Sequence, residues 1–153
     1  MGKYIAYLYG VGSYLVFFAT FLYAIGFVGN ILVPRSIDTG GAEASFVTAL
    51  LINAGLLGLF AIQHTIMSRP GFKRWWTGFV PKSVERSTFV ILASLLLLLL
   101  FWEWRPIAGQ IWSLQHPTAI IVLHGLFWLG WVIVLLSTFM INHFDLFGLR
   151  QII

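Results

Sequence analysis

Residues 63–86 read QHTIMSRPGFKRWWTGFVPKSVER and lie between two strongly apolar runs of the sequence. This stretch holds five of the nine Lys and Arg residues of the chain. Short loops rich in Lys and Arg stay on the cytoplasmic side of a membrane, and Trp75 and Trp76 suit the depth of the lipid headgroups. We therefore expect residues 63–86 to be a cytoplasmic loop that fixes the orientation of the helices on either side of it.

The composition indicates a membrane protein of one domain, residues 1–153. Hydrophobic residues make up 59% of the chain, charged residues make up only 9%, and the mean hydropathy is +0.92. These values are too apolar for a soluble domain. The formal charge of +4 is concentrated beside the apolar runs, which is typical of membrane topology and not of a protein with a nucleic-acid partner. The absence of cysteine excludes disulfides, thiolate metal ligands and a cysteine nucleophile.

Four apolar runs are long enough to cross a bilayer, which takes about 20 helical residues. They cover about residues 4–33, 44–67, 87–104 and 118–141. The first run is longer than the apolar core of a signal peptide, roughly 7 to 15 residues, so we expect no cleaved leader. The expected fold class is all-α, an integral membrane bundle of four transmembrane helices with both termini cytoplasmic.

The distribution of basic residues supports this topology. An inner amino terminus leaves only Arg35 and Arg105 outside. The basic residues then placed inside are Lys3, Arg69, Lys73, Arg74, Lys82, Arg86 and Arg150. Seven against two favours this orientation, because basic residues are enriched in cytoplasmic loops.

Two histidines lie within the apolar spans, where an ionisable group is costly and therefore a functional candidate. His64, near the end of the second span, could accept a proton or ligate haem as a neutral imidazole. The alternative is a structural histidine bonded to a carbonyl or to a lipid phosphate. His124, in the fourth span, is interpreted as structural, with a hydrogen bond to a neighbouring helix.

Polar residues gather at the inner membrane face more densely than helix ends require. Glu85 suits the positive end of a helix dipole, and that capping role alone would explain it. The whole set is Gln63, His64, Arg69, Glu85, Arg86, Asn142, His143 and Asp145. No zinc motif, P-loop, nucleophile elbow or dinucleotide-binding motif accompanies it, so no metal site is expected.

Several segments resemble the methanethiol S-methyltransferases. They are FAIQH (60–64), SRPGFKRWW (68–76), VPK (80–82), ERST (85–88), WEWRP (102–106) and NHFDLFGLRQ (142–151). The resemblance implies an integral membrane enzyme, similar to the isoprenylcysteine carboxyl methyltransferases, that uses S-adenosylmethionine to convert methanethiol to dimethyl sulfide. It covers the amino-terminal part of such enzymes. Their carboxy-terminal Arg-His-Pro-x-Tyr signature is not found in residues 1–153, so we expect this chain to lack that cofactor-binding segment and to bind the cofactor poorly alone.

Roles for the polar residues follow as hypotheses from the implied reaction, an in-line methyl transfer to a small thiol, which a proton acceptor and exclusion of water would assist. We expect His64 to accept the proton, with Glu85 or Asp145 orienting it and His143 as the next candidate. The residues expected to contact the cofactor are Arg69, Arg86 and Asn142. The expected partners are a small thiol and membrane lipid, and the expected location is the bacterial inner membrane, with the site facing the cytoplasm.

Two other interpretations stay open on the sequence. Residues 63–87 also resemble the NnrU-like membrane proteins, relatives of the haem-containing carotene isomerases. In that reading His64 would ligate haem, either alone or together with His124. A third reading is a non-catalytic helical scaffold, which predicts neither a pigment nor methyl transfer.

Overall fold

The structure is a computed structural model that describes residues 2–109 and 113–151. Within these residues every regular element is helical, so the predicted all-α class is confirmed. The long helices are α1 (Lys3–Gly29), α2 (Phe46–Ser68), α4 (Glu85–Glu103) and α5 (Pro117–Ile141). The short elements are α3 (Pro70–Trp76), α6 (His143–Leu146) and the 3₁₀ turns η1 (Lys82–Val84) and η2 (Leu149–Gln151).

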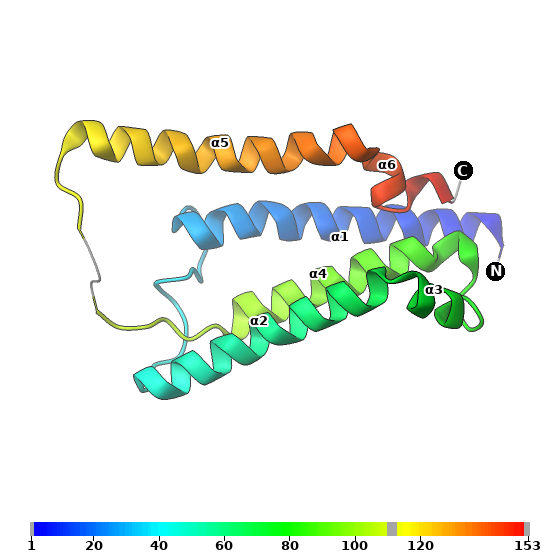
Figure 1. Ribbon diagram of the computed structural model, residues 1–153, viewed down its shortest axis with the longest axis horizontal. Helices are drawn as coiled ribbons and strands as arrows, with labels where there is room; N and C mark the ends of the chain where they lie inside the picture. The colour runs from blue at the N-terminus through cyan, green and yellow to red at the C-terminus, as the bar shows by residue number, and fades with distance from the viewer. Residues whose placement is uncertain (1, 110–112, 152–153) are drawn as a thin grey trace.

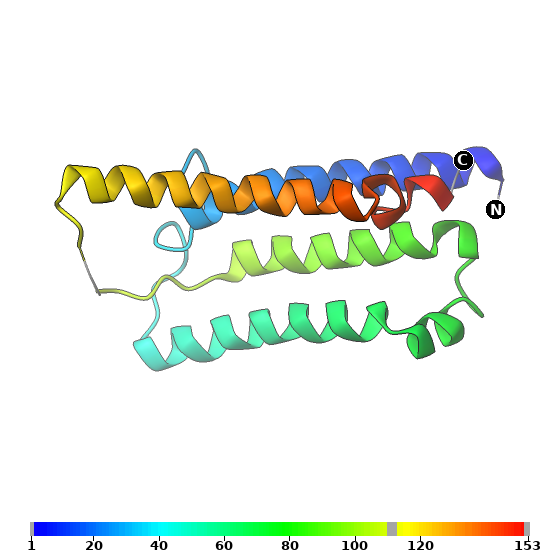
Figure 2. The ribbon, with the colours of Figure 1, turned by 45° about the horizontal axis from the view of Figure 1, so that its top comes forward.

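Within the part of the chain that the structure describes, four helical segments are long and apolar enough to cross a membrane, as the sequence predicted. They are α1, α2, α4 together with η1, and α5. They run side by side along the long axis of the molecule (Figures 1 and 2). The stretch between α2 and α4 is not entirely a loop, because it contains α3. Pro70 begins this helix, at a position where the missing backbone N–H costs nothing.

The first helix ends at Gly29 and does not continue to Val33. Asn30 adopts the left-handed conformation, with φ 54° and ψ 40°, and its N–H bonds to the carbonyl of Gly26. Asparagine is one of the few residues other than glycine that enter this region readily, so it can end a helix. The side chain of Asn30 then donates to Asp38, at 2.6 Å, within the loop that follows.

Helix α4 lies in the centre of the bundle and packs against both α1 and α2. Small hydroxyl residues line the buried faces of these helices and bond to the carbonyl one turn earlier, as in Ser13 to Tyr9, Thr20 to Val16 and Ser94 to Val90. Such residues let helix backbones approach closely. Apolar clusters fill both halves of the interface, around Phe89 and Phe147 in one and around Phe27 and Phe101 in the other.

Helix α5 stands beside α1 with much looser packing. No residue of α5 is buried, although Trp131 meets Phe21 edge to face, with ring centroids 5.5 Å apart. A helix that is apolar on every side and exposed is typical of a membrane span surrounded by lipid. It is joined to the rest of the bundle chiefly where it turns into α6.

The two ends of the bundle differ in charge. Both termini, α3, and the start of α4 lie at one end (Figure 1), and the seven basic residues predicted to be inside lie there. We call this the basic end. At the opposite end Arg35 stacks on Trp102 at 4.0 Å, and Asn53 binds the main chain of Arg105. The predicted segregation of basic residues is therefore present.

Candidate functional site

His143 is a buried polar side chain at the basic end. It is 4% exposed, and both of its ring nitrogens have partners. Oη of Tyr14, in α1, lies 2.9 Å from Nε2, and Oγ1 of Thr138, in α5, lies 2.8 Å from Nδ1. The ring stacks on Phe139 at 4.2 Å and meets Phe147 edge to face. His143 therefore connects α1, α5 and α6.

The backbone of Asn142 positions this histidine. Asn142 ends α5 and begins α6 with φ 116° and ψ 86°, and its N–H bonds to the carbonyl of Thr138. Its own carbonyl accepts the N–H of Leu146 and so closes the turn of α6. The sharp corner directs the next side chain, His143, toward α1. Asn142, predicted to contact the cofactor, thus has an evident structural role in the turn.

Arg86, in the first turn of α4, ties the chain after the corner to the bundle. Its Nε donates to the carbonyl of Leu146 at 2.8 Å. Its guanidinium lies 5.4 Å from the ring centroid of Phe89, and the same ring lies 5.1 Å from the imidazole of His64. The structure therefore brings Arg86, His64 and α6 into one region, as the sequence predicted for the inner ends of their helices.

Other predicted site residues also lie at the basic end. Asp145 pairs with Arg150 at 3.1 Å, and both are exposed. Glu85 is the first residue of α4 and is 8% exposed. Arg69 is exposed at the corner between α2 and α3, where its backbone caps both helices. Within residues 2–109 and 113–151 no hydrogen bond or ion pair joins His64 to Glu85 or Asp145, and their catalytic roles stay predictions.

Three buried polar atoms at this end lack a hydrogen-bond partner among the described residues, and one of them is Nε1 of Trp76, in α3. Nε2 of Gln63 donates to the sulfur of Met67 at 3.0 Å, but Oε1 of Gln63 has no partner. Oγ of Ser87 is equally unpartnered, and the residue is completely buried under Gly148. Such atoms are rare in folded proteins because each loses its hydration without compensation. They indicate places where a polar ligand group gains a hydrogen bond.

Tyr14 is a site residue that sequence reasoning missed. It lies in an uncharged span that gave no sign of chemistry, and its partner His143 is 129 residues away. One signal was available, because a tyrosine hydroxyl within an apolar span needs a hydrogen-bond partner. The bond of Thr138 across the corner to His143 was also missed, because it depends on the conformation of Asn142.

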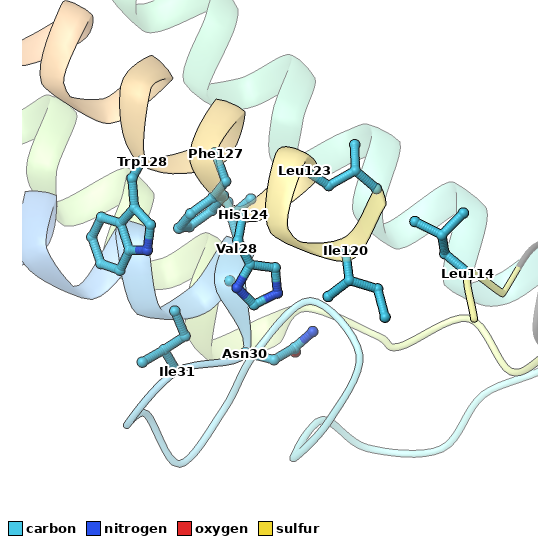
Figure 3. A pocket seen from close by; sticks show the side chains of 10 residues that line it. Val28, Asn30, Ile31, Leu114, Ile120, Leu123, His124, Phe127 and Trp128 are labelled. Carbon is cyan, nitrogen blue, oxygen red and sulfur yellow. The ribbon is translucent and has the colours of Figure 1, made fainter. Parts of the chain in front are cut away.

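A separate pocket of about 540 Å³ lies at the opposite end of the bundle, between the end of α1 and the start of α5 (Figure 3). Val28, Ile120, Phe127 and Trp128 supply much of its apolar wall, and His124 lines it too. No described residue forms a hydrogen bond with His124, so the expected bond to a neighbouring helix is not seen among these residues. His64 is at the other end of the molecule, so this pocket is not part of the site at the basic end.

The chain is similar in sequence to several known proteins. The chain is 57% identical over 152 residues to the methanethiol S-methyltransferase of Mycobacterium tuberculosis, covering 99% of the chain and 62% of that protein. It is 55% identical over 150 residues to methanethiol S-methyltransferase 1 of Bradyrhizobium diazoefficiens, covering 98% of the chain and 52% of that protein. Nurim of Bos taurus is 26% identical over 119 residues, which are 72% of the chain and 44% of Nurim.

No known family profile and no solved structure matches the chain. The resemblance seen in the sequence segments is nevertheless confirmed over almost the entire chain. The chain spans between half and two thirds of the length of the two methyltransferases named above.

Proposed function

We propose, from its similarity to the methanethiol S-methyltransferases, that this chain forms the helical membrane part of a thiol S-methyltransferase. The reaction is the transfer of a methyl group from S-adenosylmethionine to methanethiol, which gives dimethyl sulfide. The observation that carries the proposal is the 57% identity over 99% of the chain to a protein of that name. The gathering of imidazole, guanidinium and hydroxyl groups at the basic end supports it.

The side chains at the basic end suit the charged part of S-adenosylmethionine. When bound, the cofactor supplies a methyl group activated by a sulfonium centre. Arg69 is exposed and Arg86 is only half-buried, and guanidinium groups bind carboxylates with paired hydrogen bonds. The unpartnered oxygens of Gln63 and Ser87 add neutral polar atoms to the same end. Arg69, Arg86 and Asn142 would hold the anionic end of the cofactor.

The protein also has to provide a proton acceptor and a site that excludes water. A neutral imidazole can remove the thiol proton, because its pKa lies near physiological pH. His64 and His143 are both at the basic end, next to the aromatic rings of Phe89 and Phe147, respectively. Glu85 and Asp145 remain candidates for orienting His64 through movements on binding. Methanethiol, a small apolar molecule, reaches these rings from the bilayer between the helices.

We assign the basic end to the cytoplasmic face of a bacterial inner membrane, so that both termini are cytoplasmic. The seven basic residues at that end support the assignment through the enrichment of Lys and Arg in cytoplasmic loops. The cofactor is made in the cytoplasm and would reach the site without crossing lipid. Membrane lipid then surrounds the exposed faces of α5.

The haem-binding alternative is not favoured by the positions of the histidines. Helices α2 and α5 both run toward the basic end (Figure 1). At about 1.5 Å per residue, His64 lies about 27 Å from the start of α2 and His124 about 10 Å from the start of α5. The two rings are at different depths and cannot bind opposite faces of one haem. The scaffold alternative predicts no methyl transfer and is separated from the proposal by the assay below.

A chimaera tests the function of these residues directly. This chain replaces the part of the Mycobacterium tuberculosis relative that it matches, and membranes holding the chimaera receive methanethiol and S-adenosylmethionine. We expect dimethyl sulfide in the headspace by gas chromatography, and membranes with the intact relative are the positive control. A chimaera that is inserted at a normal level but forms no dimethyl sulfide contradicts the proposal. A Soret absorption band from the purified chain would instead support the haem-binding reading.

A further inference from the structure

The hydrogen bonds around His143 determine which ring nitrogen carries the proton. The hydroxyl of Thr138 donates its single hydrogen to the carbonyl of Leu135, at 2.7 Å. The same oxygen lies 2.8 Å from Nδ1 of His143, and while its hydrogen is bonded to Leu135 it acts as the acceptor there. Nδ1 consequently carries a hydrogen and donates it to Thr138.

The other nitrogen, Nε2, then holds the lone pair of the neutral ring. Oη of Tyr14, 2.9 Å away, donates its hydrogen to this lone pair. In a charged ring Nε2 would also be a donor, and the hydroxyl hydrogen of Tyr14 would lose this acceptor. The charge would in addition lie in a side chain that is 4% exposed and stacked on Phe139, where an ion is poorly solvated. This arrangement favours a neutral His143 with its lone pair on Nε2.

The charged groups of the neighbouring elements bind elsewhere. Arg86 of α4 donates to the carbonyl of Leu146, and Asp145 of α6 pairs with Arg150 of η2. Glu85, at the start of α4, makes no hydrogen bond or ion pair with His143 within the described residues. Tyr14 and Thr138 are accordingly the two groups that orient the imidazole. This is the arrangement of a base whose second nitrogen is fixed by an orienting group.

His64 has no comparable support. Its ring contacts are with Phe60 and Phe89, and no described residue donates to or accepts from its nitrogens. Tyr14 is half-buried whereas His143 is buried, so Tyr14 is the member of the pair that a small ligand can reach. His143 is thus the base that is already oriented. A small ligand can exchange a proton with it through the hydroxyl of Tyr14.

We propose that Tyr14, His143 and Thr138 form a proton relay. In it Tyr14 contacts the thiol, His143 accepts the proton, and Thr138 positions the imidazole ring. The inference rests on the proposed function and names its proton acceptor. The S–H hydrogen moves as a proton to Oη of Tyr14, and the hydroxyl proton of Tyr14 moves to Nε2. The products of the step are a thiolate and an imidazolium, which later returns its proton to water.

Nitrogen NMR of the chain in detergent micelles tests the tautomer without any activity. With ¹⁵N-labelled histidine, we expect one ring with a hydrogen on Nδ1 and a lone pair on Nε2 at neutral pH, and its signals should vanish in His143→Gln. Thr138→Val should abolish this preference and Thr138→Ser should retain it. Tyr9→Phe is the matched control, since Tyr9 also bridges two helices, through Thr88, without a histidine. A hydrogen on Nε2 or a charged ring would overturn the relay.

The chimaera tests whether the relay serves the reaction. A proton acceptor contributes about 10²- to 10⁴-fold to a rate, so Tyr14→Phe and Thr138→Val should each lower the rate of dimethyl sulfide formation at least tenfold. The loss should shrink at higher pH, where more of the thiol is already ionised, and Thr138→Ser and Tyr9→Phe should stay near the parent rate. If Tyr14→Phe unfolds the protein, the comparison of Thr138→Val with Thr138→Ser tests the relay instead. Full activity of a folded Tyr14→Phe or Thr138→Val overturns the relay alone, whereas a parent chimaera without activity contradicts the proposed function.

Discussion

Gly148 lies directly against Ser87, and this contact docks the chain after α6 onto the start of α4. A Cβ on Gly148 would lie 2.8 Å from both the backbone nitrogen and Oγ of Ser87. Gly148 also has a φ of +82°, in the region that residues with side chains rarely adopt. Two separate requirements, space and backbone conformation, thus call for glycine at this position.

Gly148→Ala should release residues 148–151 from α4. A strained backbone of this kind costs about 1 to 3 kcal/mol, in addition to the steric clash. The chain has no cysteine, so Leu149→Cys gives a unique site for a water-soluble maleimide. We expect faster labelling of Leu149→Cys when Gly148→Ala is present. Gly12→Ala is the matched control, because a Cβ there meets no atom within 4 Å. Equal labelling rates in all three backgrounds would show that Gly148 does not hold the segment.

Asn53→Ala should weaken the attachment of α2 to the opposite end of α4. Asn53 is 4% exposed and binds Arg105 twice, from Nδ2 to the carbonyl at 2.8 Å and from the Arg105 nitrogen to Oδ1 at 2.9 Å. Its loss leaves two main-chain groups without partners, which costs about 1 to 3 kcal/mol for each group that stays buried. Thermal unfolding in micelles should show a clearly lower Tm. Asn30→Gly removes a single exposed bond to Asp38, keeps the left-handed backbone that ends α1, and should change the Tm much less.

Lowering the pH should destabilise the fold through His143. Burial lowers the pKa of His143 below its usual value of 6.5, so the unfolded chain binds this proton more readily than the folded chain. The stability contributed by the neutral ring is complete above pH 6.5 and is lost as the pH falls below it. The Tm difference between the parent and His143→Gln should therefore shrink between pH 7.5 and pH 5. A difference that is constant over this range would mean that the buried ring does not titrate as described.

Labelling of single cysteines tests the orientation in the membrane. The variants Lys73→Cys and Lys82→Cys each place a cysteine at the basic end. Asp38→Cys places one in the loop at the opposite end. In intact cells an impermeant maleimide should label only the cysteine at Asp38, and the other two should react after the membrane is opened. The reverse pattern would place the site on the outer face.

The amount that could be predicted from the sequence differs between the helices and the site. Hydropathy alone located four spans, because an uninterrupted apolar run of about 20 residues is typical of a helix that crosses a bilayer. It could not show that Asn30 ends α1 or that Pro70 begins α3, since both depend on local backbone conformation. The hydrogen bond between Tyr14 and His143 could not be predicted from the sequence, for a stronger reason. It joins two residues far apart in the chain, through a corner that exists only because Asn142 adopts a positive φ.

The fate of an isotopic label tests the central claim most directly. The chimaera is supplied with S-adenosylmethionine that carries ¹³C in its transferable methyl group and with unlabelled methanethiol. Headspace mass spectrometry should then find dimethyl sulfide with one labelled carbon, formed only when both substrates are present. Dimethyl sulfide without the label, or none at all from an inserted chimaera beside an active intact relative, would contradict the assignment of thiol methylation to this chain.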